Sequence, residues 1–161
     1  MEIRPADASD WPRIWPFFAA IVEAGETYAY PWPMTPDDGR RLWMEPPPSL
    51  VVVAVDADDV LGSAKVGPNR PGRGSHVATA SFMVDARAQG RGVGRALATY
   101  ALDEATRQGY RSMQFNAVVE TNTSAVHLWR ELGFEVVGTV PEAFSSRSHG
   151  RVGLHVMHRH L

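Results

Sequence analysis

The chain has 161 residues, of which 44% are hydrophobic and 21% charged, and this balance indicates one folded domain and excludes a disordered chain. With 16 basic and 18 acidic residues the formal charge is −2, which gives no electrostatic reason to expect nucleic-acid binding or an anionic membrane partner. The absence of cysteine excludes disulfides, thiolate metal sites and a cysteine nucleophile.

The chain is expected to stay out of membranes and to work in the cytoplasm. Its longest strongly apolar run, Leu50–Val55, is far shorter than the roughly 20 residues that span a bilayer. The first residues lack the basic segment and apolar stretch that mark a signal peptide. Since no repeat or interior linker interrupts the sequence, residues 1–161 are interpreted as a single domain.

The first half of the chain is predicted to contain short strands and two helices. In chain order these are a strand over 2–5, helices over 11–24 and 35–43, and hairpin strands over 50–56 and 60–66. Pro16 predicts a kink or a late start in the first helix. An aromatic and proline-rich loop over 26–33 joins the helices, and a surface loop rich in Gly, Pro and Arg follows over 68–75.

The second half is predicted to alternate strands and helices before closing on two strands. In chain order these are a strand over 77–84, a helix over 93–107, a strand over 111–119, a helix from Asn122 to a C-cap at Gly133, and strands over 134–140 and 151–158. Residues 141–150 are expected to form a loop. This order predicts an α/β (α+β) fold with one mixed sheet of about six to seven strands and helices on both faces.

A glycine-rich segment, residues 85–97, lies between a predicted strand and a predicted helix. Because Arg95 or Leu97 stands where a Rossmann G-x-G-x-x-G needs its last glycine, that motif fails, and a Walker loop fails for want of lysine. The segment fits Q/R-x-x-G-x-G/A through Gln89, Gly92 and Gly94. Glycines and the free N–H groups of a helix start predict a loop that holds a phosphate group.

Together with a second block, this motif resembles the GNAT superfamily of N-acetyltransferases. Residues 122–134 are similar to the family pattern N-x-x-A-x-x-L-Y-x-x-x-G-F, with Trp129 at the tyrosine position. The resemblance implies a sheet splayed in its middle and acetyl-CoA as co-substrate. No metal is expected, because no Cys or carboxylate completes a ligand set with His158 and His160. The cofactor-binding residues that it implies are Phe82, Met83, Val84, Gln89, Gly90, Arg91, Gly92, Val93, Gly94, Arg95, Ala96, Asn122 and Trp129.

The family transfers the acetyl group directly to an amine, which requires an oxyanion donor and a neutral amine. The backbone N–H near Met83 or Val84 is the expected oxyanion donor. The indole of Trp129 cannot replace tyrosine as an acid. Because the strand over 77–84 has no carboxylate, the base is expected to be Glu120, Glu26 or a water chain.

The acceptor is expected to be a small-molecule amine. Residues 115–122 are similar to yeast-type enzymes that acetylate azetidine-2-carboxylate and proline analogues, and Asn116 is expected to hold substrate or a catalytic water. The expected substrate-binding residues are Thr27, Tyr28, Tyr30, Thr79 and Phe144. Two alternatives stay open: a protein or peptide N-acetyltransferase, and a non-catalytic acyl-CoA binding module. The resemblance also implies that the chain forms a homodimer.

Overall fold

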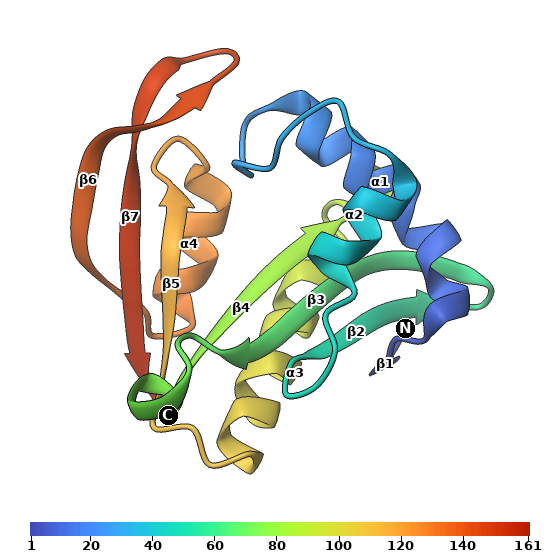
Figure 1. The fold of residues 1–161 in the computed structure, drawn as a ribbon, viewed down its shortest axis with the longest axis horizontal. Helices are drawn as coiled ribbons and strands as arrows, with labels where there is room; N and C mark the ends of the chain where they lie inside the picture. Colours follow the sequence, from blue (N-terminus) through green and yellow to red (C-terminus); the bar gives the residue numbers. More distant parts are fainter.

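The computed structural model describes residues 1–161, and its seven strands form one open mixed sheet in the order β1-β2-β3-β4-β5-β7-β6 (Figure 1). The strands are β1 (Glu2–Pro5), β2 (Leu50–Asp56), β3 (Asp59–Pro68), β4 (Val77–Val84), β5 (Ser112–Val119), β6 (Glu135–Ser146) and β7 (Gly150–His160). All neighbours are antiparallel except β4 and β5, which are parallel. The predicted fold class and strand number are confirmed.

Four α-helices cover the two faces of the sheet: α1 (Trp11–Ala24), α2 (Pro36–Trp43), α3 (Val93–Arg107) and α4 (Thr123–Glu131). α1 and α2 pack on one face over a cluster that includes Phe18 and Trp43, whereas α3 and α4 pack on the other face. None of these helices combines the length and apolarity needed to cross a bilayer. Of the kink or late start predicted at Pro16, the late start is wrong, because α1 begins at Trp11 and continues through Pro16.

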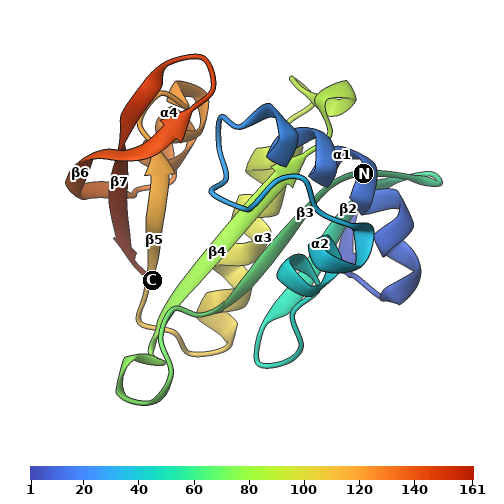
Figure 2. The same ribbon diagram turned by 45° about the horizontal axis from the view of Figure 1, so that its top comes forward.

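The sheet opens between β4 and β5, near its centre. These strands pair only at Val77–Ser112 and Ala78–Met113, and then diverge toward their C-terminal ends, as both ribbon views show (Figures 1 and 2). The pairing of β5 with β7 shifts register between Phe115 and Val118, and such a bulge bends a strand locally. The predicted splay in the middle of the sheet is therefore present.

The C-terminal hairpin is longer than the sequence pattern predicts. The loop expected over 141–150 is wrong, because β6 runs to Ser146 and Phe144 pairs with Val152 of β7. A register shift between Val140 and Phe144, with Glu142 at φ +53°, accommodates Pro141 on this edge strand. Proline in the pattern therefore marks a bulge and not the end of the strand.

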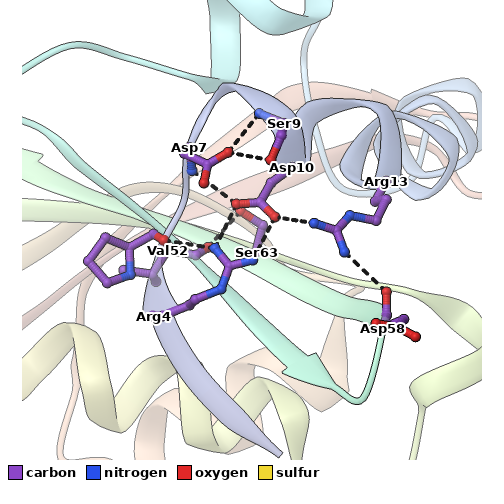
Figure 3. Close-up of polar contacts among 9 residues, drawn as sticks. Arg4, Asp7, Ser9, Asp10, Arg13, Val52, Asp58 and Ser63 are labelled. Atoms are coloured by element: carbon purple, nitrogen blue, oxygen red, sulfur yellow. Dashed lines mark hydrogen bonds and ion pairs between the residues drawn. The ribbon is translucent and has the colours of Figure 1, made fainter.

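A buried carboxylate ties β1 to the start of α1 (Figure 3). Asp10 is fully buried, and its oxygens accept two hydrogen bonds of 2.8 Å from Arg4, one of 2.8 Å from Arg13 and one of 2.9 Å from the backbone N–H of Asp7. The side-chain hydrogen bonds from Arg4 hold the pKa of Asp10 below its usual value, against the opposing effect of burial. This cluster fixes the N-terminal strand against the helix that supports the aromatic loop.

We expect Asp10→Asn to lower the free energy of unfolding by about 2 kcal/mol at pH 7, because it removes charge-assisted bonds to two arginines that stay partly hydrated. Thermal denaturation should show a loss of about 4–8 °C. Asp58→Asn is the control, since only the backbone carbonyl of Asp58 contacts Arg13.

Wild type and Asp10→Asn should also differ in how their free energy of unfolding depends on pH. Because the pKa of Asp10 is lower in the folded state, its contribution is complete above the unfolded pKa of about 4 and is lost as the pH falls through the folded value. The difference in stability between wild type and Asp10→Asn should therefore narrow below about pH 4. A constant difference from pH 7 to pH 3 would contradict this account.

Candidate functional site

The opening between β4 and β5 holds a cavity of about 940 Å³, near the upper end of the range for small-molecule sites. Four parts of the chain line it: the loop after α1, the splayed halves of β4 and β5, the glycine segment with the start of α3, and the first turns of α4. Residues far apart in sequence therefore meet where the sheet is unpaired. The cavity has room for a cofactor arm and a small second molecule.

At the end of β4 the glycine segment turns into α3 with several backbone N–H groups free. Asp85 caps the short turn Ala86–Ala88, which precedes the glycines, and accepts hydrogen bonds from the backbone and side chain of Arg87. Gly90 and Gly92 both have φ +76°, a conformation that glycine adopts without strain. Gly92 is the N-cap of α3 and provides no side-chain cap, so the first N–H groups of the helix remain available to an anion.

Gly94 leaves open space beside this helix start. A Cβ on Gly94 would lie 3.7 Å from Val84 and 3.9 Å from Leu128, which are ordinary contact distances, so packing does not demand glycine. Both neighbours line the cavity, and the missing side chain therefore widens it. The two arginines of the motif are held in exposed ion pairs, Arg91 with Asp56 and Arg95 with Glu131.

Beyond its pairing with β5, strand β4 presents the peptide groups of Phe82 and Val84 to the cavity. The N–H of Asp85 donates to Leu61 of β3, and because peptide groups alternate between the two edges of a strand, that of Met83 also faces β3. Met83 lines the cavity, but its N–H belongs to the β3 side. Of the two oxyanion donors expected from the sequence, Val84 is the one whose N–H is open.

The hydroxyl of Tyr28 occupies the peptide groups of Phe82. It donates to the Phe82 carbonyl at 2.7 Å and accepts from the Phe82 N–H at 3.0 Å, and so connects the loop after α1 to the open edge of β4. Tyr28 stacks on Tyr30 with 5.3 Å between ring centroids, and its ring also contacts Trp43. Burial raises the pKa of the Tyr28 phenol far above its usual value, so the hydroxyl stays protonated and neutral.

Two residues of the second sequence block, Asn122 and Trp129, lie at the α4 end of the cavity. Asn122 is the N-cap of α4, with its side chain accepting from the Ala125 N–H at 3.3 Å, and it also lines the cavity. Trp129 is 7% exposed and packs on Phe82 and Phe115, with ring centroids 4.9 and 4.8 Å away. Trp129 is therefore both a core residue and part of the cavity wall.

The structure gathers some predicted catalytic and substrate residues and separates others. Thr27, Tyr28, Tyr30, Thr79 and Asn116 all line the cavity. The Asn116 amide donates to the Asn69 side chain at 2.6 Å and accepts from Gln114 at 2.8 Å. Phe144 and Glu120 do not line the cavity.

Phe144 is buried against Val119 and Val152 and does not itself line the cavity, although Val119 does. Glu120 is exposed and accepts a hydrogen bond from the Gly153 N–H. Glu26 accepts from the Ser146 hydroxyl at 2.5 Å and the Ser148 N–H at 2.9 Å, and the Ser146 hydrogen bond lowers its pKa. Neither carboxylate lines the cavity.

Sequence reasoning missed Ser81 and the ion pair of Lys65 with Glu45. Ser81 shares a face of β4 with Thr79, and both line the cavity, so the period-2 alternation of strand residues was a signal that could have found it. Lys65 and Glu45 are 20 residues apart and meet only through the packing of α2 on β3. No pattern in the sequence predicts that contact.

Residues 14–134 match the acetyltransferase (GNAT) family. The chain belongs to the GNAT family. It is therefore an acyltransferase of the N-acetyltransferase type that uses acetyl-CoA as co-substrate. The free N–H groups at the start of α3, the space beside Gly94 and the open edge of β4 fit an extended molecule that carries phosphate groups at one end.

Two curated relatives cover most of the chain. The N-acetyltransferase aca1 of Schizosaccharomyces pombe is 30% identical over 156 residues, which are 87% of this chain and 75% of that protein. The L-methionine sulfoximine/L-methionine sulfone acetyltransferase of Pseudomonas paraeruginosa is 33% identical over 147 residues, which are 87% of this chain and 83% of that protein.

Solved structures with the same fold include a GCN5-related N-acetyltransferase from Kribbella flavida, 62% identical, with a TM-score of 0.96 over 99% of this chain and 97% of that one. A phosphinothricin acetyltransferase from Sinorhizobium meliloti in complex with AcCoA is 25% identical, with a TM-score of 0.87 over 99% of this chain and 88% of that one.

We expect Gly94→Ala to weaken acetyl-CoA binding by at least about tenfold while the protein stays as stable or gains about 0.5–1 kcal/mol. The added methyl has room within the protein but narrows the cavity, and alanine favours the helix. Calorimetric titration and thermal denaturation measure the two effects. Gly138→Ala on β6, with open space and remote from the cavity, is the control, and unchanged binding in Gly94→Ala would contradict the assignment.

We expect Tyr28→Phe to tighten acetyl-CoA binding by about two- to tenfold, the equivalent of one net hydrogen bond. In the wild type, a pantetheine arm that pairs with the open edge of β4 must displace the hydroxyl from Phe82. Tyr30→Phe keeps the stacked rings and the hydrogen bonds between the Tyr28 hydroxyl and Phe82, here called the clamp. Its dissociation constant for acetyl-CoA should therefore equal that of the wild type. Weaker binding by Tyr28→Phe would show that the hydroxyl supports the cofactor instead of competing with it.

Proposed function

We propose that this acetyltransferase moves the acetyl group of acetyl-CoA to the amine of a small molecule, such as an amino acid, a proline analogue or a related amine. The relatives named above as acting on methionine sulfoximine and phosphinothricin support this substrate class. The observation that carries the proposal is a connection between the two walls of the cleft, which leaves little width for a polypeptide.

That connection joins the loop after α1 to the β6–β7 hairpin. The backbone N–H of Arg147 donates to the Gly25 carbonyl at 3.1 Å, the Arg147 guanidinium donates to the Glu23 carbonyl at 3.2 Å, and the Glu26 carboxylate holds Ser146 and Ser148. Thr27, the next residue, already lines the cavity. A strap at this position supports a compact acceptor, because a peptide would need an open groove between the same two segments.

In the proposed reaction the acceptor nitrogen bonds to the acetyl carbon while the carbon–sulfur bond breaks and the amine loses a proton. The N–H groups of Val84 and, once Tyr28 is displaced, Phe82 are the donors on the open edge of β4 that can stabilise the oxyanion. Asn116, with Thr79 and Ser81 opposite, provides polar groups that can hold the acceptor or a water. Acetyl-CoA itself supplies the activated acyl group.

The cavity wall contains no Asp, Glu or His, and its titratable groups are Tyr28, Tyr30 and Arg95. The raised pKa of Tyr28 makes its hydroxyl a poor acid and the phenolate inaccessible near neutral pH. We therefore propose that the acceptor amine reaches the site neutral or passes its proton to water. The enzyme then works fastest on amines that are already deprotonated at the working pH.

The rising part of the pH profile of kcat/KM should follow the pKa of the acceptor amine when acceptors of different basicity are compared. An enzyme base would instead impose the same inflection on every acceptor. Initial rates of CoA release between pH 6 and 10 measure this. An inflection shared by all acceptors would contradict a water-mediated proton transfer.

The activity itself is tested by release of free CoA from acetyl-CoA against amino acids, proline analogues, small amines and short peptides. Turnover with a class of small amines, lost in Gly94→Asp, is the expected result, since the aspartate places a negative charge at the anion-binding helix start. Turnover with peptides alone would contradict the proposed small-molecule acceptor and indicate a peptide N-acetyltransferase. Binding of acetyl-CoA without any turnover would indicate a non-catalytic acyl-CoA module.

A further inference from the structure

A second, smaller hollow opens beside the cavity, on the face of the sheet that carries α2. Its volume is about 190 Å³, compared with about 940 Å³ for the cavity. It shares Thr79, Ala80, Ser81 and Asn116 with the large cavity, so the two spaces meet across β4. Its other wall is formed by Glu45 and Ser49, in the segment between α2 and β2, and by β3.

A lysine projects into this hollow from β3. The Lys65 ammonium donates to the Leu42 carbonyl at 2.8 Å and to the Glu45 carboxylate at 2.5 Å, and it lies 5.6 Å from the centre of the Trp43 ring. An ammonium has three donors, so one N–H remains without a partner in the chain. The Lys65 side chain is only 14% exposed, so its charge is screened far less than that of a surface lysine.

The hydroxyls around Lys65 complete a set of hydrogen-bonding groups. Lys65 is the cross-strand partner of Ser81, and Thr79 lies two residues along β4 on the same face. The Asn116 side chain faces them from β5. The third N–H of Lys65, the two hydroxyls and the second N–H of the Asn116 amide can all donate to a carboxylate, in a hollow that also contains the Glu45 carboxylate.

This hollow lies close to the reacting position. Ser81 precedes Phe82, whose peptide groups lie on the open edge of β4, and successive strand residues are about 3.3 Å apart. A group bound at Lys65 and Ser81 is therefore next to the part of β4 whose open edge begins at Phe82. An acceptor that carries both an amine and a carboxylate, such as an amino acid, can place its carboxylate in the hollow and its amine toward the large cavity, because the two spaces share lining residues.

We propose that Lys65, with Ser81 and Thr79, forms a subsite for the carboxylate of the acceptor, so that the enzyme selects amino acids and other amines that carry a carboxylate. This inference rests on the proposed small-molecule acetylation. Glu45 competes with the substrate carboxylate for Lys65 and repels it, and so lowers affinity for a carboxylate that binds there. Lys65 is a specificity-determining residue and takes no part in bond making.

The test compares two acceptors that differ only in the carboxylate, such as L-leucine and 3-methylbutylamine, in wild type, Lys65→Met and Glu45→Gln. Lys65→Met keeps the apolar stem beside Trp43 and removes the charge. We expect it to raise KM for the amino acid by at least about tenfold, as for loss of a charge-assisted hydrogen bond, with little change in KM for the amine. Glu45→Gln should lower KM for the amino acid, because it removes a competing negative charge.

The opposite directions of the two variants separate a substrate contact from a structural ion pair. If Lys65 only braces α2, both variants should change KM for both acceptors alike and lower the melting temperature, and the proposal would be overturned. Acetyl-CoA affinity by calorimetry should be unchanged in both variants, since neither residue lines the large cavity. If the wild type preferred the amine over the amino acid, the carboxylate subsite would be overturned while small-molecule acetylation would stand. If neither acceptor nor any other amine were acetylated, the subsite and the proposed small-molecule acetylation would both be overturned.

Discussion

The site depends on the short pairing of β4 with β5. Two residue pairs, Val77–Ser112 and Ala78–Met113, hold the two halves of the sheet together, and beyond them each strand leaves one edge without a partner strand. Buried peptide groups are costly to leave without hydrogen bonds, so an opened sheet needs something to satisfy those edges. On β4 the Tyr28 hydroxyl does this for Phe82, and the aromatic rings of Phe82, Phe115 and Trp129 fill the space on the α3–α4 face of the sheet.

Those features of the fold and site that depend on local patterns were predictable from the sequence. The N-cap at Asn122 and the glycine segment with α3 behind it are set by residues close together in the chain. The clamp from Tyr28 to Phe82 joins residues 54 positions apart, and no local pattern encodes it. The hairpin was misjudged because a bulge absorbs Pro141, so Phe144 became a core residue instead of part of a substrate loop.

The chemical character of the cavity follows from which charged groups stay outside it. Glu26 is committed to the strap between the aromatic loop and the β6–β7 hairpin, Glu120 to the backbone of Gly153, and the Arg91 guanidinium to Asp56. Along β4 and β5 the wall of the large cavity thus consists of backbone groups, hydroxyls, an amide and apolar side chains. In the mechanism proposed above, such a site orients its substrates and stabilises developing charge through fixed dipoles, and proton transfer is left to the substrate and solvent.

The unpaired edge of β4 also links folding to metabolism. A pantetheine arm that lies along this edge adds hydrogen bonds that the isolated chain makes only in part, so acetyl-CoA binds the folded state and not the unfolded one. At a concentration 100 times its dissociation constant, such a ligand stabilises the fold by about 2.7 kcal/mol. The resistance of this protein to proteolysis in a cell should therefore rise and fall with the supply of acetyl-CoA.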